Sequence, residues 1–122
     1  MIKTITKLLL TTVVLMPPIK TIAAGTTTFN PISAVQPRND GTFISNCSTS
    51  RSSNHLDIKP CITAPKCGTG KWFFIPITNP NHDALVSVSL TSFAAQKPVR
   101  IVGNHSCSAH GDEAVSYINL TN

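Results

Sequence analysis

Apolar and polar residues alternate in two short segments on either side of position 40, and this pattern predicts a β-hairpin. The segments are residues 32–36 (Ile-Ser-Ala-Val-Gln) and residues 42–45 (Thr-Phe-Ile-Ser), as expected for half-buried strands. The residues between them, Pro-Arg-Asn-Asp-Gly, are typical of a turn. Residues 46–70 show no sustained period and contain four serines, three cysteines, two prolines and two glycines. They predict a long loop that is ordered mainly by crosslinks.

Three further strands are predicted in the second half of the chain. Within residues 71–78, apolar side chains occupy both the odd and the even positions. This is typical of a strand that is covered on both faces. This strand should end or bulge at Pro76, which has no backbone N–H to donate. Residues 99–103 form another apolar run that ends at glycine, and residues 114–120 alternate again.

The aromatic residues of segment 71–78 need cover on both sides. We expect Phe73, Ile75 and Ile77 to face the interior, so that Trp72 and Phe74 point outward. Either the long loop or a helix packs over these two aromatic side chains, or they contact a ligand or a second subunit. The second interpretation follows because aromatic faces stack on sugar rings and favour recognition.

The segment between residues 71–78 and residues 99–103 fits both a helical and a strand period, and its assignment decides the fold. Residues 86–91 alternate as a strand would, but apolar residues also stand at helical spacing. The ends favour a helix over residues 80–96, because Asn79 can cap it, Pro80 suits its first position and Lys97-Pro98 marks its end. The predicted buried face consists of Val86, Leu90, Phe93 and Ala94, with Ser87 and Thr91 toward solvent.

The resulting order is strand, strand, strand, helix, strand, strand. Five strands with one helix after the third is the order of an OB-type barrel, in which the helix plugs one end. We therefore predict a mainly β fold with one α-helix, a small five-stranded OB-type barrel, as a single domain over residues 25–122.

Residues 1–24 have the three-part pattern of a secretory signal peptide. Basic residues at Lys3 and Lys7 precede an apolar run over residues 8–16, and small residues follow at Ala23 and Ala24. Because prolines stop the run well short of the roughly 20 residues that a transmembrane helix needs, we expect cleavage after Ala24 and no membrane span afterwards. The alternative is an N-terminal core helix. The predicted location is secreted or periplasmic.

Four cysteines follow the predicted leader, and an even number in a short exported chain predicts two disulfide bonds. They are Cys47, Cys61, Cys67 and Cys107, for which three connectivities are possible. A zinc site would recruit His105 and His110 around Cys107, but the paired two-residue cysteine spacing of such sites is missing. We expect no metal and no cofactor.

The charge of the chain changes once the predicted leader is removed. The 122 residues carry a formal net charge of +5, but residues 25–122 hold seven Lys and Arg against five Asp and Glu, which leaves 7 − 5 = +2. Phosphate-backbone binding requires clustered cations, and these are scattered. We therefore expect no nucleic-acid partner.

Candidate hydrolytic residues are present but lack the arrangement that hydrolysis needs. The candidate bases are His55, His82, His105 and His110, and the candidate nucleophiles are Ser106 and Ser108. There is no Gly-x-Ser-x-Gly elbow, and the adjacent Asp112 and Glu113 would point to opposite faces of a strand. We expect the histidines to lie in surface loops and the protein to be no enzyme. A small secreted hydrolase remains as a third class of function.

Residues 71–118 resemble a group of small exported bacterial proteins of uncharacterised role. The succession runs from Lys71-Trp72 through the capped helix, Lys97-Pro98-Val99-Arg100-Ile101-Val102-Gly103 and Cys107 to Glu113–Ile118. It is also similar, more distantly, to the B subunits of pentameric bacterial toxins of the subtilase-cytotoxin and pertussis-like types. The resemblance implies an OB-type barrel and a ring of subunits that binds cell-surface glycans. It further implies that Cys67 pairs with Cys107, which leaves Cys47 with Cys61.

The function expected from these observations is recognition rather than catalysis. The first hypothesis is an exported module that binds a cell-surface glycan or protein, a homo-oligomer and a pentamer if toxin-like, with Trp72 and Phe74 as the candidate binding or subunit surface. The alternative hypothesis is a solitary secreted or envelope structural or interaction protein.

Overall fold

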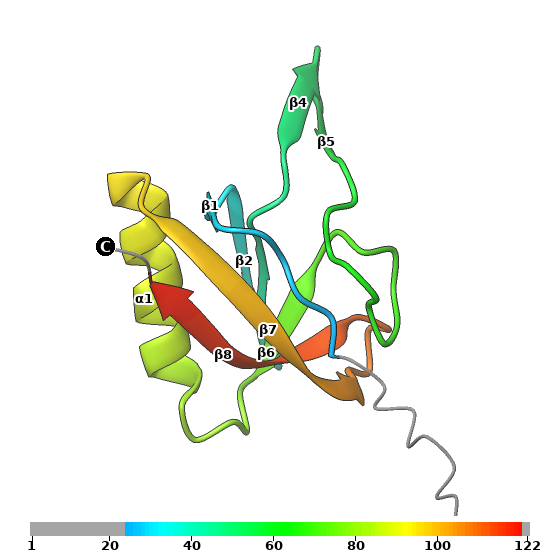
Figure 1. Cartoon of the computed structure of the whole chain (residues 1–122), viewed down its shortest axis with the longest axis vertical. Coiled ribbons are helices and arrows are strands. Elements are labelled where there is room, and N and C mark those ends of the chain that lie inside the picture. The colour runs from blue at the N-terminus through cyan, green and yellow to red at the C-terminus, as the bar shows by residue number, and fades with distance from the viewer. Residues whose placement is uncertain (1–23, 121–122) are drawn as a thin grey trace, which may run out of the picture.

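The computed structural model describes residues 24–120, which form one α-helix and eight β-strands (Figure 1). Six strands make one mixed sheet in the order β1-β7-β8-β6-β3-β2, and β4 and β5 make a separate hairpin. The strands are β1 (Asn30–Pro31), β2 (Ala34–Arg38), β3 (Gly41–Ser45), β4 (Thr49–Ser52), β5 (His55–Ile58), β6 (Phe73–Pro76), β7 (Pro98–Cys107) and β8 (Glu113–Leu120), and the helix is α1 (His82–Ala95). The fold is thus mainly β with one helix. The large sheet has edges at β1 and β2 and is not closed into the expected five-stranded barrel.

The predicted hairpin is confirmed, and the predicted long loop is partly wrong. Strands β2 and β3 pair antiparallel from Ala34 with Ser45 to Arg38 with Gly41. Within the expected loop, β4 and β5 form a second hairpin that projects from the body of the molecule (Figure 1). All four residues of β4 are exposed. Because the strand buries no apolar face, it has no hydrophobic period that sequence reasoning could detect.

Strand β6 lies between β3, to which it is antiparallel, and β8, to which it is parallel. Its residues Phe73, Phe74 and Ile75 are all buried, which confirms a strand covered on both faces that ends at Pro76. Ile77 was expected to face the interior, but it lies in the turn after the strand and is 54% exposed. The strand ends at Pro76, and although the Ile77 N–H still donates to the Asp40 carbonyl at 2.8 Å, the chain turns away there and the alternation stops.

Helix α1 confirms the helical interpretation of the ambiguous segment, although the helix begins two residues later than predicted. Asn79 does not cap the helix; its side-chain oxygen accepts from the Asn81 N–H at 2.8 Å in the preceding turn. At the other end, Gln96 takes the left-handed conformation, and the Lys97 N–H donates to the Ser92 carbonyl at 3.1 Å. This return of the chain leads directly into β7.

The predicted buried face of the helix is largely wrong. Only Val86 of the four residues packs against the core, while Leu90 and Phe93 are 50% and 47% exposed and Ala94 is exposed. The fully buried residues are Ser89 and Ser92. Both hydroxyls find backbone partners, so the small serine side chains are buried at low cost and bring the helix close to the sheet.

The core contains mostly branched apolar side chains from the four central strands and from the segments that flank them. The buried cluster consists of Ile32, Ile44, Cys47, Ile58, Ile62, Phe73, Ile75, Val99, Ile101 and Val115. Two disulfides, Cys47–Cys61 and Cys67–Cys107, join this layer to the segment between β5 and β6. They confirm the pairing that the resemblance implied.

The predicted leader lies outside the described residues, apart from Ala24. Helix α1, the one helix in residues 24–120, does not have the length and apolar character that a membrane crossing requires. Two disulfides are compatible with an oxidising, extracytoplasmic compartment.

Candidate functional site

Trp72 lines a hollow of about 270 Å³ on the face of β2, β3 and β6 that is opposite to the helix. The orientation follows from β3: Thr42 faces the helix, because its hydroxyl lies 3.1 Å from the Nε2 of His82, so its neighbour Phe43 faces the other way. We call this hollow the Trp72 pocket. It is lined by Gln36, Arg38, Phe43, Trp72, His110 and Asp112.

An aromatic cluster forms the floor of the Trp72 pocket. The Phe43 ring centroid lies 4.9 Å from that of Phe74 and 6.0 Å from that of Trp72, and the latter pair meets edge to face. The His110 ring lies 5.2 Å from both phenylalanine rings. Phe74 is only 4% exposed and lies beneath Phe43 and His110. The structure therefore places both aromatic residues singled out in the sequence against Phe43, with Trp72 on the wall of the pocket and Phe74 beneath Phe43 and His110.

His110 reaches the pocket because the link between β7 and β8 turns tightly. The Ser108 N–H donates to the Asp112 carbonyl at 2.7 Å, and the Gly111 N–H donates to the Ser108 carbonyl at 3.0 Å. Gly111 has a φ of 83°, in the left-handed region that favours glycine. The Cys67–Cys107 disulfide anchors the start of this turn.

Charged groups surround the aromatic floor. The Arg38 guanidinium carbon lies 5.6 Å from the centroid of the Phe43 ring, a cation–π arrangement. His110 hydrogen bonds to Asp40, and this bond holds the pKa of Asp40 below its usual value, helped by the positive charges of His110 and Arg38. Burial raises the pKa of Asp112, against the opposing effect of His110. The pocket thus combines an aromatic wall with a guanidinium, an amide and a carboxylate.

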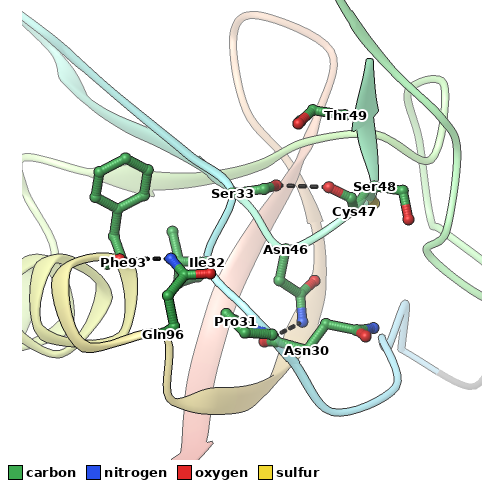
Figure 2. Close-up of a pocket in the computed structure, with 10 residues that line it drawn as sticks. All are labelled: Asn30, Pro31, Ile32, Ser33, Asn46, Cys47, Ser48, Thr49, Phe93 and Gln96. Carbon is green, nitrogen blue, oxygen red and sulfur yellow. Dashed lines mark hydrogen bonds between the residues drawn. The ribbon is translucent and has the colours of Figure 1, made fainter.

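A second hollow of about 350 Å³ lies between β1, the end of β3 and the C-terminal end of α1 (Figure 2). We call it the Phe93 groove. Its lining residues are Asn30, Pro31, Ile32, Ser33, Asn46, Cys47, Ser48, Thr49, Phe93 and Gln96.

Several polar groups of the Phe93 groove already serve the fold. The Ser33 hydroxyl donates to the Cys47 carbonyl at 2.6 Å, and the Gln96 side chain donates to the Phe93 carbonyl at 2.8 Å (Figure 2). The Asn46 amide group is 2% exposed and donates to the Val99 carbonyl at 2.8 Å and to the Thr27 hydroxyl at 2.9 Å. By contrast, the side chains of Gln36 and Arg38 have no hydrogen bond within residues 24–120. The Trp72 pocket is therefore the better candidate for ligand binding.

The candidate hydrolytic residues do not assemble into a nucleophile and base. His82 at the start of α1 contacts Thr42 and Asp83, and His110 contacts Asp40. The Ser106 hydroxyl donates to the Asn104 side chain at 2.6 Å, and the Ser108 hydroxyl accepts from the His110 backbone at 3.2 Å. Within the described part of the chain, neither serine hydroxyl hydrogen bonds to a histidine ring.

The disulfide of Cys107 removes the thiolate that a zinc site with His105 and His110 would need. Over residues 24–120, no group of three or more histidine, cysteine, aspartate or glutamate side chains is arranged to hold a metal ion.

Of the six residues that line the Trp72 pocket, sequence reasoning identified only Trp72 as a candidate binding residue and missed the other five. Gln36 and Arg38 are two residues apart in β2, so their side chains lie on the same face of the strand. The alternating pattern of the hairpin could have shown this. His110 and Asp112 reach the pocket only through the turn between β7 and β8; Gly111 is a local signal for that turn, but no local signal shows that the turn packs against β3. Comparison with known proteins adds no family or function, because no protein-family model, no curated protein and no solved structure matches this chain.

Proposed function

We propose that this protein is an exported, non-enzymatic recognition module that binds a cell-surface glycan in the Trp72 pocket. The observation that carries the proposal is the partly buried Trp72 indole beside three planar polar groups, those of Gln36, Arg38 and Asp112. Sugar rings present apolar C–H faces that stack on aromatic rings, and their hydroxyls pair with amide, guanidinium and carboxylate groups.

The resemblance over residues 71–118 supports the same function, since toxin B subunits bind cell-surface glycans. Under this proposal the six-stranded sheet is an opened relative of the OB-type barrel, and five copies form a ring. The predicted leader and the two disulfides support export to a secreted or periplasmic location.

The test is binding of the protein purified from the exported fraction to an immobilised array of cell-surface glycans, with affinities measured for each glycan retained. We expect Arg38→Ala and Gln36→Ala to weaken binding by about tenfold or more, because each removes a hydrogen bond to the sugar. Both side chains are exposed, so these variants should fold normally. Trp72→Ala should abolish binding.

Two control variants locate the site. Arg51→Ala removes an exposed arginine from the β4–β5 hairpin, and Phe93→Ala removes the aromatic side chain of the Phe93 groove. Neither should change the affinity. Failure to retain any glycan, or an affinity that depends on Phe93 and not on Arg38, would refute the proposed function at this pocket.

A structural or interaction protein is the second candidate, and the outer face of α1 favours it. Leu90 and Phe93 are about half exposed there and lie one turn apart, and a contiguous apolar patch on a surface is a feature of protein–protein interaction sites. Native mass spectrometry separates the two candidates: a pentamer supports the toxin-like ring, and a monomer that retains no glycan supports the solitary protein.

A further inference from the structure

Glu113 is a buried carboxylate that the proposed glycan site does not use. It is 1% exposed and opens β8, where its oxygens accept hydrogen bonds from three separate segments. The Gly25 nitrogen lies 3.2 Å from both oxygens, the Lys66 backbone nitrogen lies 2.6 Å from Oε1, and the His105 backbone nitrogen lies 3.4 Å from Oε2. Within residues 24–120, no lysine, arginine or histidine side chain forms an ion pair with it.

A buried carboxylate is costly unless a positive charge offsets its lost hydration. Three backbone N–H groups supply partial positive charge but no formal charge. Among residues 24–120, Glu113 therefore has no counter-ion of the kind that a buried acid ordinarily has in proteins.

Two glycines shape the space around this carboxylate. A side chain at Gly103 would overlap the Glu113 carboxyl group, so the acid occupies the space that a side chain would fill. A Cβ at Gly25 would lie 2.8 Å from Oε1 and 3.1 Å from both Ile62 and Pro65. Position 25 thus holds the smallest residue, and its nitrogen is centred on the carboxylate.

Gly25 is fixed in this position by the backbone as well. The Gly103 N–H donates to the Gly25 carbonyl at 2.8 Å, and the next residue, Thr26, exchanges backbone hydrogen bonds with Thr63 at 3.1 and 2.8 Å. In Figure 1 the first coloured segment enters the molecule beside the end of β7 and the start of β8. The nitrogen of Gly25 is therefore held in a preformed slot.

We propose that Glu113 is the binding site for the protein's own mature amino terminus, the α-ammonium group of Gly25. The inference rests on the leader predicted from the sequence, with cleavage after Ala24, and is independent of glycan binding. Hydrolysis of the Ala24–Gly25 peptide bond adds water across the C–N bond, leaving a carboxylate on Ala24 and an amine on Gly25, which takes up a proton. The amide that donates one N–H to Glu113 thereby becomes a cation with three.

The geometry also sets the order of events. Gly25 is buried and paired with Gly103, so a protease cannot reach the Ala24–Gly25 bond once this corner has folded. Cleavage precedes docking, and the new terminus at Gly25 then joins the backbone N–H groups of Lys66 and His105 around one acid next to the Cys67–Cys107 disulfide. Docking of the terminus thus completes the folded domain after the leader is removed.

The experiment uses the protein purified from the exported fraction after expression with its own leader. Mass spectrometry should show a chain that begins at Gly25. Three variants of this chain are compared by thermal unfolding: one acetylated at the α-amine, one that retains Ala24, and Glu113→Gln. Acetylation and the retained alanine each remove the cation from the carboxylate while leaving an amide at Gly25, and each should lower the unfolding midpoint by about 5 °C or more.

Coupling and reactivity distinguish this ion pair from a general effect on the N-terminus. In the Glu113→Gln background, acetylation should lower the midpoint by little further. The α-amine of the unmodified protein should undergo reductive methylation at least about tenfold more slowly than the α-amine of the Ala24-retaining chain, since a buried ion pair hinders deprotonation. Asp112→Asn, which removes the neighbouring carboxylate, is the control and should leave the amine protected.

A mature chain that begins elsewhere would overturn the proposal, as would additive effects of acetylation and Glu113→Gln, or an α-amine that reacts equally fast in both chains. If Glu113→Gln does not fold, the acetylated and Ala24-retaining chains still decide the question. None of these results depends on whether a glycan binds.

Discussion

Ser92 joins the C-terminal end of α1 to the chain that enters the sheet. Its side chain is 0% exposed. The hydroxyl donates to the Lys97 carbonyl at 2.6 Å and accepts from the Ile32 N–H at 3.0 Å. One buried hydroxyl therefore bonds to two backbone groups, the Ile32 N–H and the Lys97 carbonyl, that are 65 residues apart in the sequence.

Replacing Ser92 by alanine should destabilise the protein by about 1–3 kcal/mol, because it leaves the buried Ile32 N–H without a partner and removes the bond to the Lys97 carbonyl. Thr91→Ala is the matched control. Its hydroxyl bonds to the Ser87 carbonyl at 2.9 Å on the exposed side of the helix, and its loss should change stability by less than about 0.5 kcal/mol. Urea unfolding measures both variants, and equal losses would contradict the role given to Ser92.

The pair formed by Asp40 and His110 makes stability depend on pH at the acid end. Because the pKa of Asp40 is lowered in the folded protein, the native state binds this proton less readily than the unfolded chain does. The stability that Asp40 contributes is therefore present above the ordinary aspartate pKa of 3.8 and is lost as pH falls through the lowered pKa of the folded protein.

Asp40→Asn should accordingly lower the thermal midpoint at pH 7 and have progressively less effect as pH approaches about 2. Thermal unfolding of wild type and variant at several pH values between these limits measures the difference. The control is Asp57→Asn, which changes an exposed carboxylate of β5. A difference between wild type and Asp40→Asn that stays constant with pH would show that the aspartate acts through packing alone.

At the scale of elements, α1 shows how hydrophobic spacing can identify a helix and still misplace its buried face. The period and the end signals predicted a helix at residues 80–96, close to the observed His82–Ala95. The predicted stripe ran through Leu90 and Phe93, whereas Ser89 and Ser92 face the sheet. Serine counts as polar in a pattern, but a serine bonded within its own helix is compatible with burial. The Ser89 hydroxyl donates in this way to the Leu85 carbonyl at 2.8 Å.

This face assignment predicts that a charge is tolerated at Leu90 and not at Ser89. Leu90→Asp should cost less than about 1 kcal/mol, since the side chain is half exposed. Ser89→Asp places a carboxylate without a partner against the core and should cost about 3 kcal/mol or more. Urea unfolding compares the two variants. If Leu90→Asp lost more stability than Ser89→Asp, the buried face of the helix would be the one expected from the hydrophobic spacing.

The β4–β5 hairpin illustrates a different limit of sequence reasoning. Its residues are almost all exposed, and only Ile58 is buried. The hairpin is defined by backbone pairing between Thr49 and Ile58 and between Ser52 and His55. Such pairing leaves no trace in a hydrophobic pattern, whereas the β2–β3 hairpin, with five buried residues in β3, was evident from the sequence.

For the whole molecule, local patterns predicted the elements but not how the distant ones pair. The parallel contact of β6 with β8 and the edge strand β1 on β7 join segments far apart in the chain, and together they give an open six-stranded sheet. The candidate site divides in the same way. Trp72 was evident from the aromatic run that leads into β6, but His110 and Asp112 reach it through the β7–β8 turn, which only the folded chain brings near.

The two disulfides crosslink regions of different size, so their removal should have different consequences. Cys67–Cys107 closes a separation of 40 residues and Cys47–Cys61 one of 14. Loop-closure entropy in the unfolded chain then gives losses of about 4 and about 3 kcal/mol for the paired alanine variants. The two variants should differ more in which region loses its structure than in total stability. Cys107 anchors the turn that carries His110 and Asp112, whereas Cys47–Cys61 lies at the base of the β4–β5 hairpin.

Hydrogen exchange under native conditions measures this local difference. The variant Cys67→Ala with Cys107→Ala should lose protection at Ser108 and Gly111, whose N–H groups hold the turn. The variant Cys47→Ala with Cys61→Ala should lose protection in β4 and β5 and retain it in the turn. If both variants lost protection uniformly, the disulfides would act only through global stability. A loss confined to the turn in the first variant would instead show that this crosslink keeps His110 and Asp112 beside Trp72.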